Sequence, residues 1–453
     1  MSKRIHSDSD YFLAGKSMGP LLATFSIFAT WFGAESCVGT SSKVFQLGFG
    51  GSLTDPFGYV ICIFLMGLVF SRILWRTNFT TIADVISDRY GKKIEFITAV
   101  LIIPGSLIWA GAQIKAFGNV LQANMSVNIH IATTIAAGVI LIYTISGGLL
   151  ADAYSDLIQG FVLIIGLVVL MITVVIDSGG ISSTWALAQQ QNTLIQNTIE
   201  PITWSIRIET LMVPILGSLM SQELVSRILS TKNEKIAYRS CLWAGWIYLL
   251  IGIIPITLGL VGSSVLPGLE QTDMLTPLLA KKYLNYYFYI IFLGALVSAI
   301  LSTVDSTLLA VSAIATHNLF PQYKNLPEKK KVFYARLGVL VSGLIAYAVA
   351  FSSDTISGLV EYASSIGGPI ILSIVIFALF TKIGNATNAG IAIAVGAISW
   401  VIFEFFVEIN TPVILTTVMT IIGYIGVSVI RKCYVKLPFT QATLRKWIGV
   451  FLP

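Results

Sequence analysis

TFSIFATWFGAESCVGTSS, residues 24–42, is a long apolar stretch that small and polar residues interrupt in its middle. A helix that crosses the hydrocarbon core of a bilayer needs about 20 mainly apolar residues, because every backbone N–H and C=O must be satisfied inside the segment. Residues 18–47 are long enough for such a helix, yet they contain Gly33, Gly39 and a polar cluster around Glu35. The stretch therefore predicts a membrane-spanning helix that is broken at Gly33.

The rest of the chain is similarly apolar. Of its 453 residues, 55% are hydrophobic and 11% are charged, and the mean hydropathy is +0.84. A water-soluble protein of this length would not have this composition, so the sequence predicts an all-α polytopic membrane protein. The twelve candidate spans are 18–47, 52–75, 93–122, 129–148, 157–177, 206–229, 237–262, 285–316, 333–352, 355–380, 386–407 and 411–430.

The basic residues between these spans are distributed unevenly. Most of the 28 Lys and Arg fall in connections on one side of the membrane, and the positive-inside rule places that side in the cytoplasm. We therefore expect the N-terminal segment 1–17 and the tail 431–453 to be cytoplasmic, and the protein to lie in the plasma membrane. The same asymmetry accounts for the net charge of +6, so this charge does not indicate nucleic-acid binding.

Motifs for covalent chemistry are missing from the sequence. It has no P-loop, no GxSxG and no HExxH, and its cysteines and histidines do not show the spacing of metal ligands. We expect neither an enzyme nor a protein with an organic cofactor.

A second interrupted span lies at residues 209–227, ETLMVPILGSLMSQELVSR, which contain Pro214 and Gly217. Many transporters consist of two inverted repeats whose broken helices meet at the membrane midplane. Glycine and proline are also common in ordinary membrane helices, which is the alternative interpretation. The equivalent positions of the two breaks favour a transport core over 18–380, with inverted five-helix repeats at 18–177 and 206–380 and two accessory helices within 386–430.

The eighth span, FLGALVSAILSTVDSTLLAVSAIATHNL at 292–319, carries a possible ion site. Ala299, Ser302 and Thr303 are spaced i, i+3 and i+4, so one carbonyl and two hydroxyls share a helix face. Hard oxygen ligands suit a small cation such as sodium, and the carbonyls of Ala29 and Phe32 at the first break would complete the set. The alternative is that these hydroxyls only bond back to the carbonyl four residues earlier.

Four ionisable residues fall at membrane depth and are functional candidates for that reason. They are Glu35, Lys115, Glu223 and Asp305. Glu35 and Lys115 either pair with each other or face the ammonium and carboxylate of a zwitterionic substrate. Trp31 and Trp109 either line a pocket, where they would stack on a cation, or are packing residues.

The sequence resembles the sodium:solute symporter family over essentially its whole length. Four motifs carry the resemblance: DYFLAGKSMG at 10–19, YTISGGLLADAYSDLIQG at 143–160, SQELVSRILSTKNEKIAYR at 221–239 and GALVSAILSTVDSTLLAVSA at 294–313. The resemblance implies a fold similar to that of the leucine transporter. It also implies a sodium site formed by the residues that match Ala29, Phe32, Ala299, Ser302 and Thr303.

A second ion position also follows from the resemblance. The aspartate of the family's W-T-D-x-x-Q motif corresponds to Asp156 in YSDLIQ, and we take Asp156 and Asp305 as a possible second ion site.

Together these features predict a sodium-coupled symporter that takes up a small polar organic solute by alternating access. The solute is expected to contact the first, third, sixth and tenth spans. The candidate substrate residues are Trp31, Glu35, Trp109, Lys115, Ser218, Gln222, Ser364 and Ser365. The alternatives are a proton-coupled carrier that uses Glu35 or Asp305, and a sensor that binds solute without transporting it.

Overall fold

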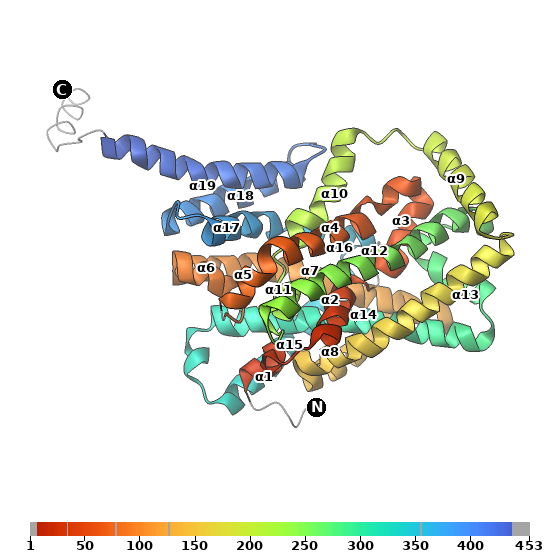
Figure 1. Ribbon diagram of the computed structural model, residues 1–453, viewed down its shortest axis with the longest axis horizontal. Helices are drawn as coiled ribbons and strands as arrows, with labels where there is room; N and C mark the ends of the chain where they lie inside the picture. The colour runs from red at the N-terminus through yellow and green to blue at the C-terminus, as the bar shows by residue number, and fades with distance from the viewer. Residues whose placement is uncertain (1–6, 34, 78, 126, 354–355, 437–453) are drawn as a thin grey trace.

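The computed structural model of the chain describes residues 7–33, 35–77, 79–125, 127–353 and 356–436, and these form an elongated bundle of helices (Figure 1). The described residues contain no β-strand beyond one isolated bridge between Met18 and Thr231. Of the predicted terminal segments, residues 1–6 and 437–453 lie outside the described part.

The α-helices in chain order are α1 (Asp8–Leu13), α2 (Pro20–Trp31), α3 (Thr40–Leu47), α4 (Tyr59–Leu65), α5 (Ser71–Arg76), α6 (Ile82–Tyr90), α7 (Lys92–Met125), α8 (Ile129–Asp177), α9 (Ile181–Thr198), α10 (Trp204–Ser218), α11 (Gln222–Leu229), α12 (Glu234–Val265), α13 (Leu275–Tyr283), α14 (Tyr286–Ile314), α15 (Glu328–Val349), α16 (Ile356–Ser365), α17 (Gly368–Phe380), α18 (Ala386–Phe405) and α19 (Pro412–Lys436). Short 3-10 or π turns are η2 (Ala14–Lys16), η3 (Glu35–Gly39), η4 (Gly48–Ser52), η5 (Leu53–Gly58), η6 (Met66–Phe70), η7 (Thr272–Met274), η8 (Ala315–Leu319) and η9 (Pro321–Asn325).

Nine of the described helices are long and apolar enough to cross a membrane, or ten if the bent pair α10 and α11 forms one span. The twelve spans predicted from sequence differ from this count for two reasons. Two apolar helices, Pro20–Trp31 and Ile129–Ile145, are short, and residues Glu35–Arg76 count as one helix. Within that segment the backbone leaves helical geometry at Gly48 (φ 63°, ψ −152°) and again at Asp55 (φ −132°, ψ 125°).

Both breaks predicted from the sequence are present. α2 ends at Trp31, and helical geometry resumes only at Glu35, where η3 begins. α10 and α11 are bent by 51° across their connection. A third break separates α16 from α17 at Gly367, whose φ of 75° is readily adopted only by glycine.

α8 is two helices that meet at Gly148, where φ is 65° and ψ is 170°. This glycine is the last residue of the fourth predicted span, 129–148. The first and third family motifs also meet, because the backbone of Met18 pairs with Ser230 at 3.1 Å and with Lys232 at 3.0 Å. The N-terminal motif is thereby attached to the end of α11.

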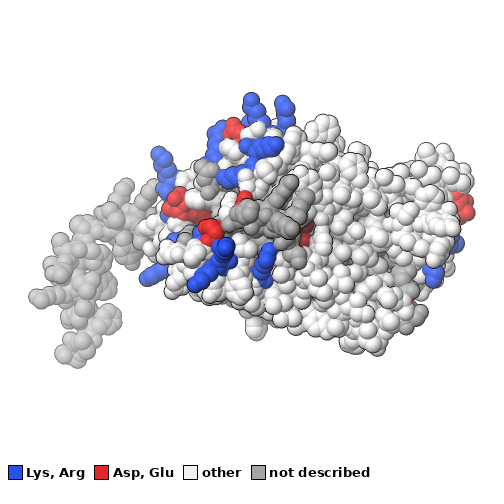
Figure 2. All heavy atoms as spheres, turned by 90° about the horizontal axis from the view of Figure 1, so that it is seen from below, with Lys and Arg blue, Asp and Glu red and all other residues white. Residues whose placement is uncertain are grey.

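Charged side chains on the visible face gather at one end of the molecule, and a broad uncharged band separates them from a few charges at the other end (Figure 2). α9 and α13 lie toward one end in Figure 1, and α5 and α6 lie toward the other. The exposed basic residues of the α5–α6 end and its neighbouring connections include Arg72, Arg76, Lys92, Lys93, Lys232, Lys235 and Arg239. An uncharged band between two polar ends is the surface that a bilayer requires.

Candidate ion and substrate sites

The break at the end of α2 frees one carbonyl for binding. In a continuous helix the N–H of Gly33 would bond to the carbonyl of Ala29, but it bonds to Trp31 at 2.8 Å instead. The Ala29 oxygen instead lies 3.3 Å from the hydroxyl of Thr303, which is also 3.1 Å from the carbonyl of Ala299. Three of the five predicted sodium ligands therefore converge.

Gly33 makes this approach of α2 and α14 possible. A side chain at this position would collide with the Thr303 hydroxyl. Phe32, a further predicted ligand through its carbonyl, lies at the point where helical geometry ends, with φ −76° and ψ 62°. The hydrogen bond from Thr303 to Ala299 is the local back-bond that the alternative interpretation expects within one helix. In this structure the same Thr303 hydroxyl also reaches the carbonyl of Ala29 in α2.

Ser302, the fifth predicted ligand, donates a hydrogen bond to Asp156. The hydroxyl of Ser26 in α2 donates to the other oxygen of Asp156 at 2.6 Å. Asp156 thus connects the second half of α8 to α2 and to α14. A hydroxyl that donates its proton to a carboxylate still has lone pairs with which to bind a cation.

A fully buried arginine lies beside this carboxylate. Arg227 from α11 donates to Asp152 at 2.9 Å and to Asp156 at 3.4 Å, and its Nε bonds to the carbonyl of Ser26 at 3.0 Å. Two carboxyl groups and one guanidinium thus share a region that excludes water. The sequence analysis assigned no role to Arg227 or Asp152, although both lie in family motifs.

Asp305 lies two residues beyond Thr303 in α14 and is also buried. Its Oδ1 has no hydrogen-bond partner among the described residues, whereas Asp156 bonds to Ser26, Ser302 and Arg227. The two aspartates therefore have different partners, and a shared ion site remains a prediction.

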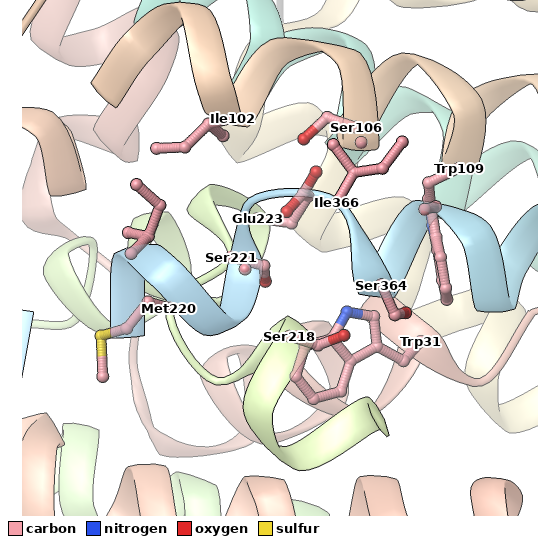
Figure 3. Close-up of a pocket in the computed structure, with 15 residues that line it drawn as sticks. Trp31, Ile102, Ser106, Trp109, Ser218, Met220, Ser221, Glu223, Ser364 and Ile366 are labelled. Carbon is pink, nitrogen blue, oxygen red and sulfur yellow. The ribbon is translucent and has the colours of Figure 1, made fainter. Parts of the chain in front are cut away.

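A cavity of about 60 Å³ lies where the breaks of the α10–α11 and α16–α17 spans face α7 and the end of α2 (Figure 3). It is lined by Trp31, Ile102, Gly105, Ser106, Trp109, Gly217, Ser218, Met220, Ser221, Glu223, Ala363, Ser364, Ile366, Gly368 and Ile371. Four predicted substrate residues, Trp31, Trp109, Ser218 and Ser364, are among them. A larger cavity of about 760 Å³ between α8, α9 and α12 has a mostly apolar lining away from these breaks.

Glu223 is the acidic residue of this lining, and its side chain lies near Ser106 in Figure 3. It stands in the first turn of α11, where the helix dipole stabilises a negative charge, and only 5% of its surface is exposed. The sequence analysis identified Glu223 as a charge at membrane depth but did not assign it to the substrate. The lining contains no Lys, Arg or His among the described residues.

Glu35, another predicted substrate residue, lies in a separate acidic group beside the cavity. Its neighbour Ser36 lies 2.6 Å from Asp55 and 3.1 Å from the carbonyl of Trp31. The hydroxyl of Tyr248 also bonds to Asp55, at 3.0 Å. Sequence reasoning missed Asp55, although its place within the predicted span 52–75 was a usable signal.

Besides Glu35, three predicted substrate residues do not line the cavity. Gln222 accepts a bond from the backbone of Ile82 at 2.8 Å and so holds the start of α6. Ser365 bonds back to the carbonyl of Tyr362 at 2.9 Å. Lys115 has Asp273 of η7 as an electrostatic neighbour, so the structure does not pair it with Glu35.

Comparison with known proteins agrees with this architecture. A model of the sodium:solute symporter family matches residues 11–396. The high affinity choline transporter 1 of Homo sapiens is 27% identical over 396 residues, which cover 83% of this chain and 68% of the relative. The high-affinity proline transporter PutP of Bacillus subtilis is 26% identical over 425 residues, which cover 88% of each chain.

Solved structures show the same fold at lower identity. A substrate-bound, outward-open sodium-coupled sialic acid symporter superimposes with a TM-score of 0.82 at 17% identity, covering 95% of this chain and 93% of the other. Mhp1, a nucleobase-cation-symport-1 transporter in a closed conformation, gives a TM-score of 0.62 at 16% identity, with 98% of each chain covered. The fold is that of the leucine transporter, as predicted, and the chain belongs to the sodium:solute symporter family.

Proposed function

We propose that this protein is a sodium-coupled symporter whose sodium ion is held by Ala29, Phe32, Ala299, Ser302 and Thr303. The observation that carries the site is the free carbonyl of Ala29, which meets the hydroxyl of Thr303 across two helices at 3.3 Å. Sodium gives up its hydration shell only where several fixed oxygens replace it. A broken helix supplies such oxygens, because the backbone carbonyls at the break no longer accept a hydrogen bond within the helix.

The buried charges beside the site favour a cation there. With both carboxyl groups ionised, Asp152, Asp156 and Arg227 have a net charge of −1, and Asp156 reaches the sodium ligands through Ser302. One sodium ion would neutralise this group, which lowers the free energy of a buried charge. Sodium entry is driven by its concentration gradient and by the membrane potential, which contributes about 2.3 kcal/mol per charge per 100 mV.

The solute site is the cavity at the breaks, and its lining favours a small organic solute with a positively charged nitrogen. Two indole rings and one carboxylate, from Trp31, Trp109 and Glu223, are groups that stabilise a cation. The cavity volume of about 60 Å³ is roughly that of two water molecules. Binding therefore requires the lining spans to move apart, as alternating access provides.

Both termini are placed in the cytoplasm, with the protein in the plasma membrane. The basic residues of the α5–α6 end support this orientation.

Proton coupling is the second candidate, and one observation favours it. Both oxygens of Glu35 and one of Asp305 are buried without a hydrogen-bond partner among the described residues. A carboxylate in such surroundings is a plausible proton carrier.

Uptake into proteoliposomes separates these two mechanisms. A panel of small amines, zwitterions and sugars is tested with a sodium gradient and, separately, with a proton gradient. We expect sodium to drive uptake, and Thr303→Ala to raise the sodium concentration for half-maximal uptake about tenfold, equivalent to about 1.4 kcal/mol.

Thr316→Ala is the matched control, because Thr316 lies beyond the end of α14 and only bonds back to the carbonyls of Ser312 at 2.7 Å and Ala313 at 3.3 Å. Uptake driven by protons alone would favour the second candidate. An unchanged sodium dependence in Thr303→Ala and Ser302→Ala would contradict the proposed sodium site.

A further inference from the structure

Three buried acceptor oxygens beside the cavity lack a hydrogen bond of normal geometry, and the nearest donor to Glu35 is the hydroxyl of Tyr59. They are Oε1 and Oε2 of Glu35 and Oδ1 of Asp55, and none has a hydrogen-bond partner among the described residues. Glu35 is 2% exposed and Asp55 is 3% exposed, so water does not satisfy them. The second oxygen of Asp55 is already bonded, to Ser36 at 2.6 Å and Tyr248 at 3.0 Å.

The positive charge near these carboxylates is already engaged. Lys43 is an electrostatic neighbour of both Glu35 and Asp55, but its ammonium forms an ion pair with Glu361. Glu361 therefore binds the Lys43 ammonium directly, and Glu35 and Asp55 have only the weaker, more distant attraction of the same charge. An unpaired charge in such surroundings costs several kcal/mol, so the group is built to receive a cation or a proton.

The unused acceptors match one functional group closely. A primary ammonium has three N–H donors and no acceptor, so it can satisfy both oxygens of Glu35 and the free oxygen of Asp55. A quaternary ammonium has no N–H group and would leave all three acceptors unpaired. The cost of unpaired polar groups is what allows a site to reject a solute of similar size.

Aromatic rings connect this acidic group to the cavity. The carbonyl of Trp31 accepts from Ser36, and its indole ring lines the cavity. The ring of Tyr59 lies 5.1 Å from that of Trp31 and 6.2 Å from that of Trp109. A hydrocarbon segment would pack against these rings, and Glu223 lines the same cavity as Trp31 and Trp109.

We propose that the solute is a short aliphatic diamine, with one ammonium bound by Glu35 and Asp55 and the other by Glu223, and its methylene chain across the aromatic rings. This inference rests on the proposed function, because it assumes that the cavity is the transport site. The described lining has no basic side chain, so a solute with a carboxylate would lack a partner there.

Competition against sodium-driven uptake tests the inference. The labelled probe is 1,4-diaminobutane, and the competitors are 1,5-diaminopentane, butylamine, choline and lysine. We expect the diamine to compete about tenfold better than butylamine or choline, because only the diamine satisfies both acidic sites. Butylamine is the matched comparison, since it differs from the probe by one terminal amino group.

Isosteric variants locate the two ends. Glu35→Gln and Asp55→Asn, at one end, are each expected to weaken both the diamine and butylamine about tenfold, whereas Glu223→Gln, at the other end, is expected to weaken the diamine and to leave butylamine nearly unchanged. Glu209→Gln is the control, because Glu209 is a buried carboxylate outside the cavity that bonds to the backbone of Val413 at 2.6 Å. Its diamine preference should equal that of the wild type.

The outcomes separate the two proposals. Sodium-driven uptake of choline or another monocation, with no competition by diamines, overturns the inference and leaves the proposed function intact. If sodium drives uptake of none of these solutes, the proposed function is contradicted. Thermal stabilisation of the purified protein by 1,4-diaminobutane then decides the inference, and no stabilisation overturns it.

Discussion

Arg227 is the residue whose loss should cost most stability. Its side chain is fully buried and bonds to Asp152 and Asp156. Arg227→Met removes the guanidinium and leaves both carboxylates buried without compensation, which typically costs 3–5 kcal/mol, so we expect a loss of roughly that size. The measurement is thermal or denaturant unfolding of the protein in detergent.

A double-mutant cycle identifies the cause of this loss. Arg227→Met combined with Asp152→Asn removes one of the two unpaired charges, so part of the stability should return. If Arg227→Met unfolds at the wild-type temperature, the buried ion-pair network does not stabilise the fold.

At single residues, the sequence predicted what local spacing determines. Ala299 and Thr303 share a helix face by their spacing, and the structure places both against Ala29 at the break. Whether Glu35 meets Lys115 or Asp55 depends on how three helices are rotated relative to one another. The spacing of residues along one helix does not predict this rotation. Glu35 proved to lie with Asp55.

At the scale of elements, the broken spans meet through backbone contact. Gly217 in α10 lies directly against the carbonyl of Ser364 in α16, and Gly368 in α17 lies against the carbonyl of Gly217. A methyl group at Gly217 would collide with main chain, which cannot move aside as a flexible side chain can. We expect Gly217→Ala to reduce sodium-driven uptake about tenfold or more through this overpacking.

Gly294→Ala is the matched control for this variant. Gly294 also lies in a membrane-spanning helix, but an added methyl group there would meet nothing within 4 Å. Uptake is normalised to the amount of monodisperse protein recovered by gel filtration. Equal uptake by Gly217→Ala and Gly294→Ala would show that the close packing of the broken spans is not needed for transport.

The elements themselves were largely predictable, because membrane helices show their length and composition directly. The two breaks were visible as Gly33 and as Pro214 with Gly217. The third break, at Gly367, was not predicted, since its φ of 75° is a property of the folded backbone. The long α8 shows the same limit, because Gly148 turns the chain within one run of helical residues.

At the scale of the whole molecule, charge and structure give a consistent orientation. The exposed basic residues of α5 and of the connections before α7 and α12 lie toward one end, and α9 lies toward the other. The broken spans and the buried carboxylates lie between these ends. The proposed sites therefore lie between the two ends, whichever end faces outward.

Cysteine labelling decides which end faces outward. Cys37, Cys62, Cys241 and Cys433 are replaced by serine or alanine, and single cysteines are introduced as Gln190→Cys in α9 and Lys235→Cys in α12, both at exposed positions. Because Lys and Arg are retained on the cytoplasmic side during insertion, a membrane-impermeant maleimide added to intact cells should label Gln190→Cys and leave Lys235→Cys unlabelled. Permeabilised cells provide the control, since both positions should then react. If only Lys235→Cys is labelled in intact cells, the α5–α6 end faces outward and the proposed orientation is wrong. The direction of sodium-coupled uptake would then run from the α5–α6 end to the α9 end.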